Sequence, residues 1–169
     1  MIVGIIGAGT MGSGIAQAFA QVDGYEVRLC DINEEFAANG KLRITKTLEK
    51  RVAKGKMAKE DADKIIAKIK TGTKEICSDC DLIVEAAVEN VDIKRQTFKE
   101  LDKICKPECI FTTNTSSLSI TQIAAGLEHH VVGMHFFNPA PVMKLVEIIA
   151  GLNTPKEVAD RVVAIATEI

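Results

Sequence analysis

The chain has 169 residues, 47% of them hydrophobic and 26% charged, which is the composition of one ordinary globular domain. Its net charge of −2 gives no indication of nucleic acid as a partner, and no apolar run reaches the roughly twenty residues that span a bilayer. The glycine-broken N-terminal stretch lacks a basic leader, and five cysteines, an odd number, fit a reducing compartment better than a disulfide framework. We therefore expect a cytoplasmic protein that does not act on nucleic acid or membranes.

Along the chain, strand-like runs alternate with helical patterns. The predicted elements are a strand over 1–6, a helix over 11–22, a strand over 26–30, a helix over 34–53, a helical stretch with Ala62, Ile65, Ile66 and Ile69 on one face, a strand-like run over 81–88, a helix over 91–104, a strand over 109–114, a helix over 118–125, and strands over 130–137 and 144–149. Thr154, Pro155 and Glu157 predict a capping box that opens a last helix, with Thr154 at the N-cap. This alternation predicts a parallel sheet covered by helices on both faces.

A glycine-rich turn lies between the first strand and the first helix. Gly7, Gly9 and Gly12 fit the pattern G-x-G-x-x-G, in which the glycines permit a tight turn, close approach of a diphosphate, and close packing of the helix. Asp31 ends the second strand, where an acid accepts hydrogen bonds from the adenosine ribose and repels a 2′-phosphate. These features predict NAD rather than NADP, against the alternatives of a plain glycine turn and a helix-capping aspartate. The candidate cofactor residues of the turn are Gly7, Ala8, Gly9, Thr10, Met11 and Gly12.

Four segments together resemble a known family: GAGTMGSGIAQ (7–17), VEAAVEN (84–90), NTSSLSIT (114–121) and GMHFFNPAPVMKLVEII (133–149). They are similar to the NAD-binding domain of the 3-hydroxyacyl-CoA dehydrogenases, most of all the bacterial enzymes acting on 3-hydroxybutyryl-CoA. The resemblance implies a Rossmann-type, doubly wound, mainly parallel sheet with an added helical hairpin. It also implies NAD-dependent oxidation of a short-chain 3-hydroxyacyl-CoA to the 3-oxoacyl-CoA, and the reverse, in fatty acid and butyrate or butanol metabolism.

His135 and Glu147 are the candidate catalytic pair. Oxidation of a secondary alcohol by hydride transfer needs a base for the hydroxyl proton, and imidazole is suited to that role near neutral pH. If the chain turns about Pro141, the carboxylate comes to lie opposite the ring, which it can orient and stabilise as the imidazolium. The family resemblance assigns the pair its role, whereas a histidine between apolar residues is by itself more often a core residue.

Other site residues follow from the resemblance. Ser116 is implied in catalysis and in substrate and cofactor binding, its hydroxyl contacting the substrate's 3-oxygen, while Ser117 is the expected helix cap. Asn138 is implied near the nicotinamide, and Glu89 and Lys94 beside the nicotinamide ribose. From spacing alone, a serine here could cap a helix, Asn138 could belong to an Asn-Pro turn, and Glu89 could be a helix-start acid.

Residues 41–56 carry seven basic side chains and one acid. Lysines 46, 50 and 54 recur every four residues, opposite an apolar stripe. A solvated face is the ordinary explanation, but the phosphates of an acyl-CoA would also be attracted by this charge. The resemblance suggests Thr47 and Lys54 as acyl-CoA contacts without fixing which lysines take part.

The cysteines raise the possibility of a metal. Cys77 and Cys80, with Cys105 and Cys109, approximate a four-thiolate zinc site. The second pair straddles a predicted helix end and strand start, and the resembled family needs no metal. We therefore expect no metal site.

Members of the resembled family carry a second, mainly helical domain that supplies dimer contacts and part of the acyl-CoA cleft. The sequence ends at Ile169 without such a domain, so we expect a truncated form or a half-enzyme, with a full-length form dimerising through that domain. Two functions stay open. One is a dehydrogenase domain that turns over weakly or not at all when isolated, and the other is a non-catalytic NAD-binding module that acts through a partner chain.

Overall fold

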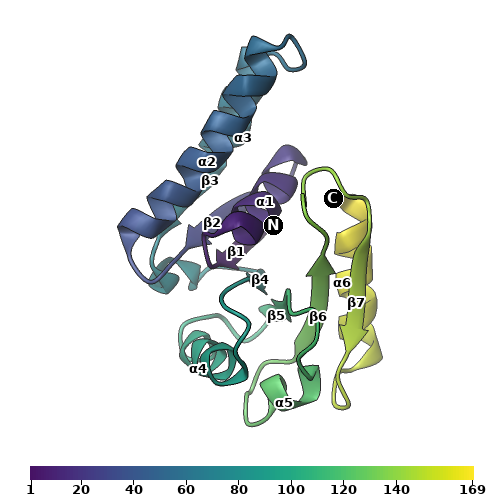
Figure 1. The fold of residues 1–169 in the computed structure, drawn as a ribbon. Coiled ribbons are helices and arrows are strands. Elements are labelled where there is room, and N and C mark those ends of the chain that lie inside the picture. Colours follow the sequence, from purple (N-terminus) through teal and green to yellow (C-terminus); the bar gives the residue numbers. More distant parts are fainter.

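The computed structural model describes residues 1–169 as one seven-stranded sheet with helices on both faces (Figure 1). The strand order is β3-β2-β1-β4-β5-β6-β7, and all neighbours are parallel except β7, which is antiparallel to β6. The strands are β1 (Ile2–Ile6), β2 (Glu26–Cys30), β3 (Ile69–Gly72), β4 (Leu82–Glu85), β5 (Ile110–Thr113), β6 (Val131–Phe136) and β7 (Val146–Ala150).

Two sets of helices cover the sheet. The helices are α1 (Thr10–Gln21), α2 (Glu34–Ala53), α3 (Lys59–Ala67), the short 3-10 helix η1 (Lys74–Cys77), α4 (Val91–Leu101), α5 (Ile120–Ala124) and α6 (Lys156–Glu168). Side chains of α1, α2, α3 and α6 belong to one buried cluster, and those of η1, α4 and α5 belong to the other. The α2–α3 hairpin extends beyond the sheet in Figure 1. The predicted doubly wound, mainly parallel sheet with a helical hairpin is therefore confirmed.

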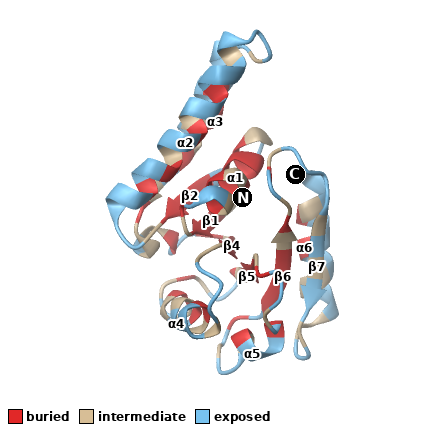
Figure 2. Ribbon diagram, in the orientation of Figure 1, coloured by how far each residue is buried: buried red, intermediate tan, exposed pale blue.

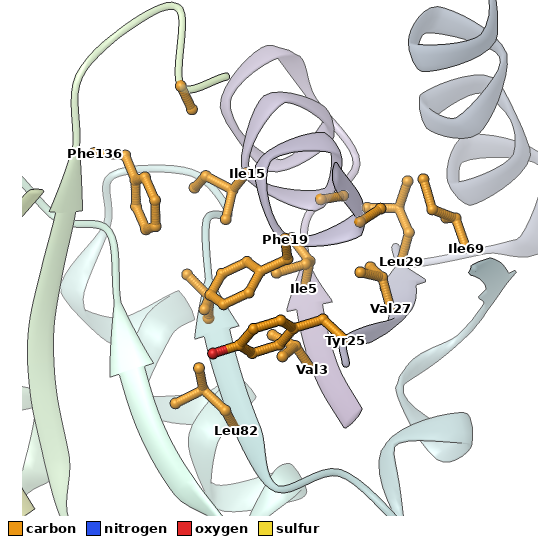
Figure 3. Close-up of a cluster of buried hydrophobic side chains, with 14 of the residues drawn as sticks. Val3, Ile5, Ile15, Phe19, Tyr25, Val27, Leu29, Ile69, Leu82 and Phe136 are labelled. Carbon is orange, nitrogen blue, oxygen red and sulfur yellow. The ribbon is translucent and has the colours of Figure 1, made fainter. Parts of the chain in front are cut away.

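The larger core lies between α1 and the sheet. Ile15 and Phe19, four residues apart on α1, face strand residues such as Ile5 (Figure 3). The ring of Phe19 meets that of Tyr25 edge-on, with centroids 5.4 Å apart. Successive residues of the central strands alternate between the two clusters, which explains why β1 and β4 read as continuous apolar runs. Figure 2 shows this buried centre, with exposed residues along the outer helix faces.

The smaller core contains all five cysteines, which are buried free thiols. The sulfur of Cys30 lies 3.5 Å from that of Cys77, and the stacked rings of Phe98 and Phe111 lie 5.4 Å apart in the same cluster. No group of three or more histidine, cysteine, aspartate or glutamate side chains is arranged to hold a metal ion. None of the helices combines the length and apolar character that a bilayer crossing requires.

One strand was not predicted. Ile69, expected on a helical face, is the first residue of β3 and pairs with Val27 at the edge of the sheet. The helix before it ends at Ala67. The sequence does not show this change from helix to strand, because β3 is a short edge strand. Its two buried residues are too few to produce an alternating pattern.

Helix boundaries also differ from prediction, most clearly at the start of α6 and the end of α4. The capping box at the last helix is wrong: Pro155 is the N-cap of α6, and no side chain caps it. The hydroxyl of Thr154 instead accepts a hydrogen bond from the Gly151 N–H (2.8 Å) and donates to the Val131 carbonyl (3.1 Å). Thr154 therefore closes the turn after β7. Helix α4 ends at Leu101 rather than at residue 104.

Candidate active site

The glycine turn joins β1 to α1, and each glycine has its own steric reason. Gly7 has φ +99°, and a Cβ there would lie 2.7 Å from the Ala86 carbonyl oxygen. A Cβ on Gly12 would lie 1.7 Å from the Gly7 carbonyl oxygen, so only glycine permits this packing of the helix. A Cβ on Gly9 would meet nothing within 4 Å. The turn therefore has an open side at Gly9, beside the N-terminus of α1, which fits the diphosphate of a dinucleotide.

Asp31 lies at the carboxyl end of β2, next to this turn. Its Oδ2 accepts a hydrogen bond from the Ala8 N–H (2.6 Å), and its Oδ1 accepts one from the Ile32 N–H (2.8 Å). A carboxylate offers about four acceptor positions, so two are left for ribose hydroxyls. Asp31 thus connects the second strand to the glycine turn, in addition to the ribose-binding role predicted for it.

A cleft of about 530 Å³ opens where the strand order reverses between β1 and β4, the usual ligand site of such sheets. It brings together six of the predicted site residues, Met11, Glu89, Lys94, Ser116, His135 and Asn138, from distant parts of the chain. Its lining residues are Met11, Ala86, Ala87, Glu89, Lys94, Asn114, Ser116, His135, Phe136, Phe137 and Asn138.

The pair of His135 and Glu147 forms as predicted. These residues are direct partners in the antiparallel β6–β7 ladder, and His135 Nδ1 lies 2.8 Å from Glu147 Oε2. Because a carboxylate only accepts, Nδ1 donates and Nε2 carries the free lone pair. Nε2 has no hydrogen-bond partner in the protein, and the ring rests against Phe137, with centroids 4.8 Å apart. The cleft is therefore lined by an oriented histidine that has one nitrogen available as a base.

Lys94 is buried between two carboxylates. Its Nζ lies 2.9 Å from both carboxylate oxygens of Glu85 and 3.4 Å from Glu89 Oε2. Glu85 is fully buried at the end of β4, where it also accepts from the Ala87 N–H and the Thr113 hydroxyl, each at 2.7 Å. A buried pair held by this many hydrogen bonds fixes the direction of the ammonium group. Glu85 was not predicted, although a lone acid within the apolar run 82–88 was a signal for it.

Glu89 connects this network to Ser116. Its carboxylate accepts hydrogen bonds from the Thr115 hydroxyl and, at 3.2 Å, from the Ser116 N–H. Burial raises the pKa of Glu89, but the Thr115 hydrogen bond and the charge of Lys94 outweigh it and hold that pKa below its ordinary value. Glu89 is therefore a carboxylate at neutral pH, and it fixes the loop that carries Ser116.

The serine loop differs from prediction at one residue. Ser119, not Ser117, caps α5, its hydroxyl accepting from the Gln122 N–H. The hydroxyl of Ser116 makes no hydrogen bond in the protein and is free for a ligand. Asn114, which was not predicted, accepts from the Phe136 N–H at 2.8 Å and ties the end of β5 to β6.

A second cleft, of about 440 Å³, lies between α1, α2 and the loop that begins at Asn138. Thr47 lines it, as do Arg43 and Arg51 from the same helix face. Lys54 is exposed at the C-terminal cap of α2 and does not line this cleft. The lysine stripe is solvent-exposed, so two arginines supply the positive charge of this cleft.

Comparison with known proteins agrees with this geometry. Residues 2–169 match the family described as "3-hydroxyacyl-CoA dehydrogenase, NAD binding domain". The chain is 45% identical over 168 residues to a probable 3-hydroxybutyryl-CoA dehydrogenase of Bacillus subtilis, a match that covers 98% of this chain and 58% of that protein. It is 44% identical to the 3-hydroxybutyryl-CoA dehydrogenase of Clostridioides difficile, covering 100% of this chain and 61% of the relative. The chain thus spans about 60% of the length of these relatives.

Solved structures show the same fold. The crystal structure of 3-hydroxybutyryl-CoA dehydrogenase from Escherichia coli K12 superposes with a TM-score of 0.94 at 40% identity, covering 99% of this chain and 36% of the other. That of (S)-3-hydroxybutyryl-CoA dehydrogenase PaaH1 from Ralstonia eutropha gives a TM-score of 0.92 at 40% identity, covering 99% of this chain and 60% of the other. With a glycine turn that fits a dinucleotide and a family match over nearly its whole length, this chain belongs to the NAD-binding domains of the 3-hydroxyacyl-CoA dehydrogenase family.

Proposed function

We propose that this chain supplies the cofactor site and the catalytic pair for NAD-dependent oxidation of a short-chain 3-hydroxyacyl-CoA to the 3-oxoacyl-CoA, and for the reverse reaction. The observation that carries the proposal is the His135–Glu147 pair, which leaves one ring nitrogen free at a cleft beside the glycine turn. The names of the Bacillus subtilis and Clostridioides difficile relatives support this substrate class.

The cofactor site is assigned to residues around the turn. The open side at Gly9 holds the diphosphate, Asp31 accepts from the adenosine ribose, and Glu89 and Lys94 bind beside the nicotinamide ribose. Asn138 lines the same cleft and contacts the nicotinamide end. When bound, NAD supplies the hydride acceptor for the alcohol.

The proton is handled by the catalytic pair. His135 Nε2 takes the proton of the substrate's 3-hydroxyl, and the carboxylate of Glu147 stabilises the resulting imidazolium through Nδ1. The free hydroxyl of Ser116 donates to the 3-oxygen and stabilises negative charge there in the reverse direction.

The second cleft is assigned to the anionic part of the acyl-CoA. Arg43 and Arg51 attract its phosphates, and Thr47 offers a hydroxyl on the same face.

We infer a homodimer for a form that spans the full length of the relatives. We also place the protein in the cytoplasm, since its five buried cysteines are free thiols.

The test is NADH oxidation with acetoacetyl-CoA, followed by absorbance. It is run on the chain alone and on the chain joined to the segment of the Bacillus subtilis relative that it does not span. We expect turnover in the joined form and little or none in the chain alone. In the joined form His135→Gln should lower the rate by about 10² to 10⁴. His130→Gln, the same change at an exposed histidine outside both clefts, should leave the rate unchanged. NADH binding without turnover in both forms would contradict the proposal and favour a non-catalytic NAD-binding module.

A further inference from the structure

Ala8, in the middle of the glycine turn, is held by three different elements. Its N–H donates to Asp31 Oδ2 at 2.6 Å, from the end of β2. Its carbonyl accepts two hydrogen bonds, one from Ser13 Oγ in α1 at 3.0 Å and one from Arg43 Nη1 in α2 at 3.1 Å. One backbone carbonyl is therefore fixed by two side chains that lie thirty residues apart in the sequence.

The next amide is left free. The N–H of Gly9 donates to no group of the protein. The Ala8–Gly9 peptide is trans, so its N–H points away from its carbonyl and hence away from Ser13 and Arg43. The space beyond Gly9 is open, since a Cβ there would meet nothing within 4 Å. The donors on one side of the peptide thus determine where its unpaired N–H points on the other.

We propose that Ser13 and Arg43 are positioning residues for the cofactor's diphosphate. By fixing the Ala8 carbonyl they keep the Gly9 N–H directed to the open side of the turn, where a phosphate oxygen accepts it. A peptide unit held in advance does not have to be ordered when the ligand binds, so affinity for the diphosphate is higher. The inference rests on cofactor binding alone, so it can hold or fail independently of turnover.

The positive charge of Arg43 offers a competing explanation, because a cation near the turn attracts a diphosphate without orienting any peptide. Ser13 separates the two explanations, since its hydroxyl is neutral and bonds the same oxygen. Lys46 is a matched control for charge. It lies on the same helix as Arg43, is exposed, and makes no hydrogen bond or ion pair in the protein.

The experiment compares the dissociation constants of ADP and adenosine, measured by NMR titration, in the chain and four variants. The variants are Ser13→Ala, Arg43→Met, the double variant and Lys46→Met. We expect each single change at Ser13 or Arg43 to weaken ADP binding about 2- to 10-fold, the effect of one hydrogen bond, with adenosine binding unchanged. The double variant should depart from the product of the two single effects, because both residues hold one oxygen. Lys46→Met should leave both constants unchanged.

Several results would overturn the proposal. Equal weakening of ADP binding by Arg43→Met and Lys46→Met would show that the positive charge of α2 attracts the diphosphate. The same conclusion would follow if Ser13→Ala had no effect, because the orientation of the Ala8 carbonyl would then not contribute. If the binding of adenosine and the binding of ADP weaken by the same factor, Ser13 and Arg43 stabilise the whole turn and do not specifically orient the Gly9 N–H toward the diphosphate. A double variant that equals the product of the single effects would show two independent contacts. Thermal unfolding of each variant confirms that the titrated protein is folded.

Discussion

Two histidine–carboxylate pairs lie near opposite ends of β6, and they differ in one respect. His135, within β6, uses Nδ1 to reach Glu147 and leaves Nε2 free at the cleft. His129, before the first residue of β6, uses both nitrogens: Nδ1 lies 2.5 Å from Asp102 Oδ1, and Nε2 lies 3.0 Å from the Lys106 carbonyl oxygen. Both ring nitrogens of His129 thus face acceptor groups of the protein, and neither is free to contact a substrate.

The two rings also differ in burial and packing. The His129 ring stacks on Phe111 in the smaller core, with centroids 4.3 Å apart, and its side chain is 5% exposed. The His135 side chain is 18% exposed, and its carboxylate partner is 53% exposed. The same contact between a histidine and an acid is therefore structural for His129 and Asp102. For His135 and Glu147 it orients a candidate base. The free Nε2 of His135 makes the difference.

The largest expected effect is on turnover. His135→Gln keeps a polar side chain of similar size but removes the base. In the chain joined to the segment of the Bacillus subtilis relative, it should lower the rate of the acetoacetyl-CoA reaction by about 10² to 10⁴. NADH affinity should stay near that of the unchanged chain, because His135 does not touch the glycine turn. Steady-state rates and an NADH titration measure the two quantities. A loss of NADH binding comparable to the loss of rate would show that this pair, too, is structural.

The next effect is on stability, at the other end of the strand. His129→Ala removes two hydrogen bonds and the stacking on Phe111, and it should lower the free energy of unfolding by about 2 to 4 kcal/mol. Urea unfolding followed by circular dichroism measures this loss. His130→Ala, an exposed neighbour, is the matched control and should change stability little. If His129→Ala instead lowers turnover in protein that is still fully folded, the contrast between the two histidines is wrong.

Glu147→Gln should cost less than His135→Gln, about 10- to 100-fold in rate, because the exposed carboxylate orients the ring but does not itself take the substrate proton. The amide can still accept from Nδ1, but it cannot stabilise the imidazolium by charge. Rate measurements on the two variants side by side give the ratio. Equal losses would mean that the pair acts as one unit in the proton transfer.

The smallest effect is a pH dependence at the structural pair. Burial raises the pKa of Asp102, but hydrogen bonds from the Glu128 N–H and from His129 outweigh it and hold that pKa below the ordinary aspartate value. A carboxyl whose pKa is lower in the folded than in the unfolded protein stabilises the fold above its unfolded pKa, near 3.9. That contribution is lost as the pH falls through the folded pKa.

Asp102→Asn tests this dependence. The variant should be less stable than the unchanged chain at neutral pH, and the difference should shrink as the pH falls below about 4. Urea midpoints measured across that range give the comparison. A difference that stays constant with pH would show that the charge of Asp102 contributes nothing to the pair.

The parts of the site that the sequence predicted are those with a local signature. The glycine turn and Asp31 follow from the order of strand, turn and helix. His135 and Glu147 are twelve residues apart on two strands joined by a proline-containing loop, so their pairing depends on one nearby turn. Glu89, Lys94, Ser116 and Asn138 were assigned by family resemblance, and the structure brings them to one cleft.

The parts that the sequence did not predict depend on contacts between distant elements. Asp102, the C-cap of α4, and His129, in the loop before β6, are 27 residues apart, and no sequence pattern indicates that they meet. Arg43 reaches Ala8 across 35 residues, while the basic segment gave no reason to prefer its arginines over Lys54. The strand β3 and the role of Thr154 in a turn likewise depend on neighbours in the sheet and not on local pattern.

The alternation of strands and helices and the glycine turn could thus be predicted from hydrophobic period and glycine spacing, which are local properties. His135 and Glu147 were proposed as the catalytic pair from the family resemblance. Local patterns could not predict which buried charges meet, which serine caps α5 or which histidine keeps a free nitrogen. Those outcomes depend on the packing of whole elements, which brings one acceptor or another within hydrogen-bonding distance of a given side chain.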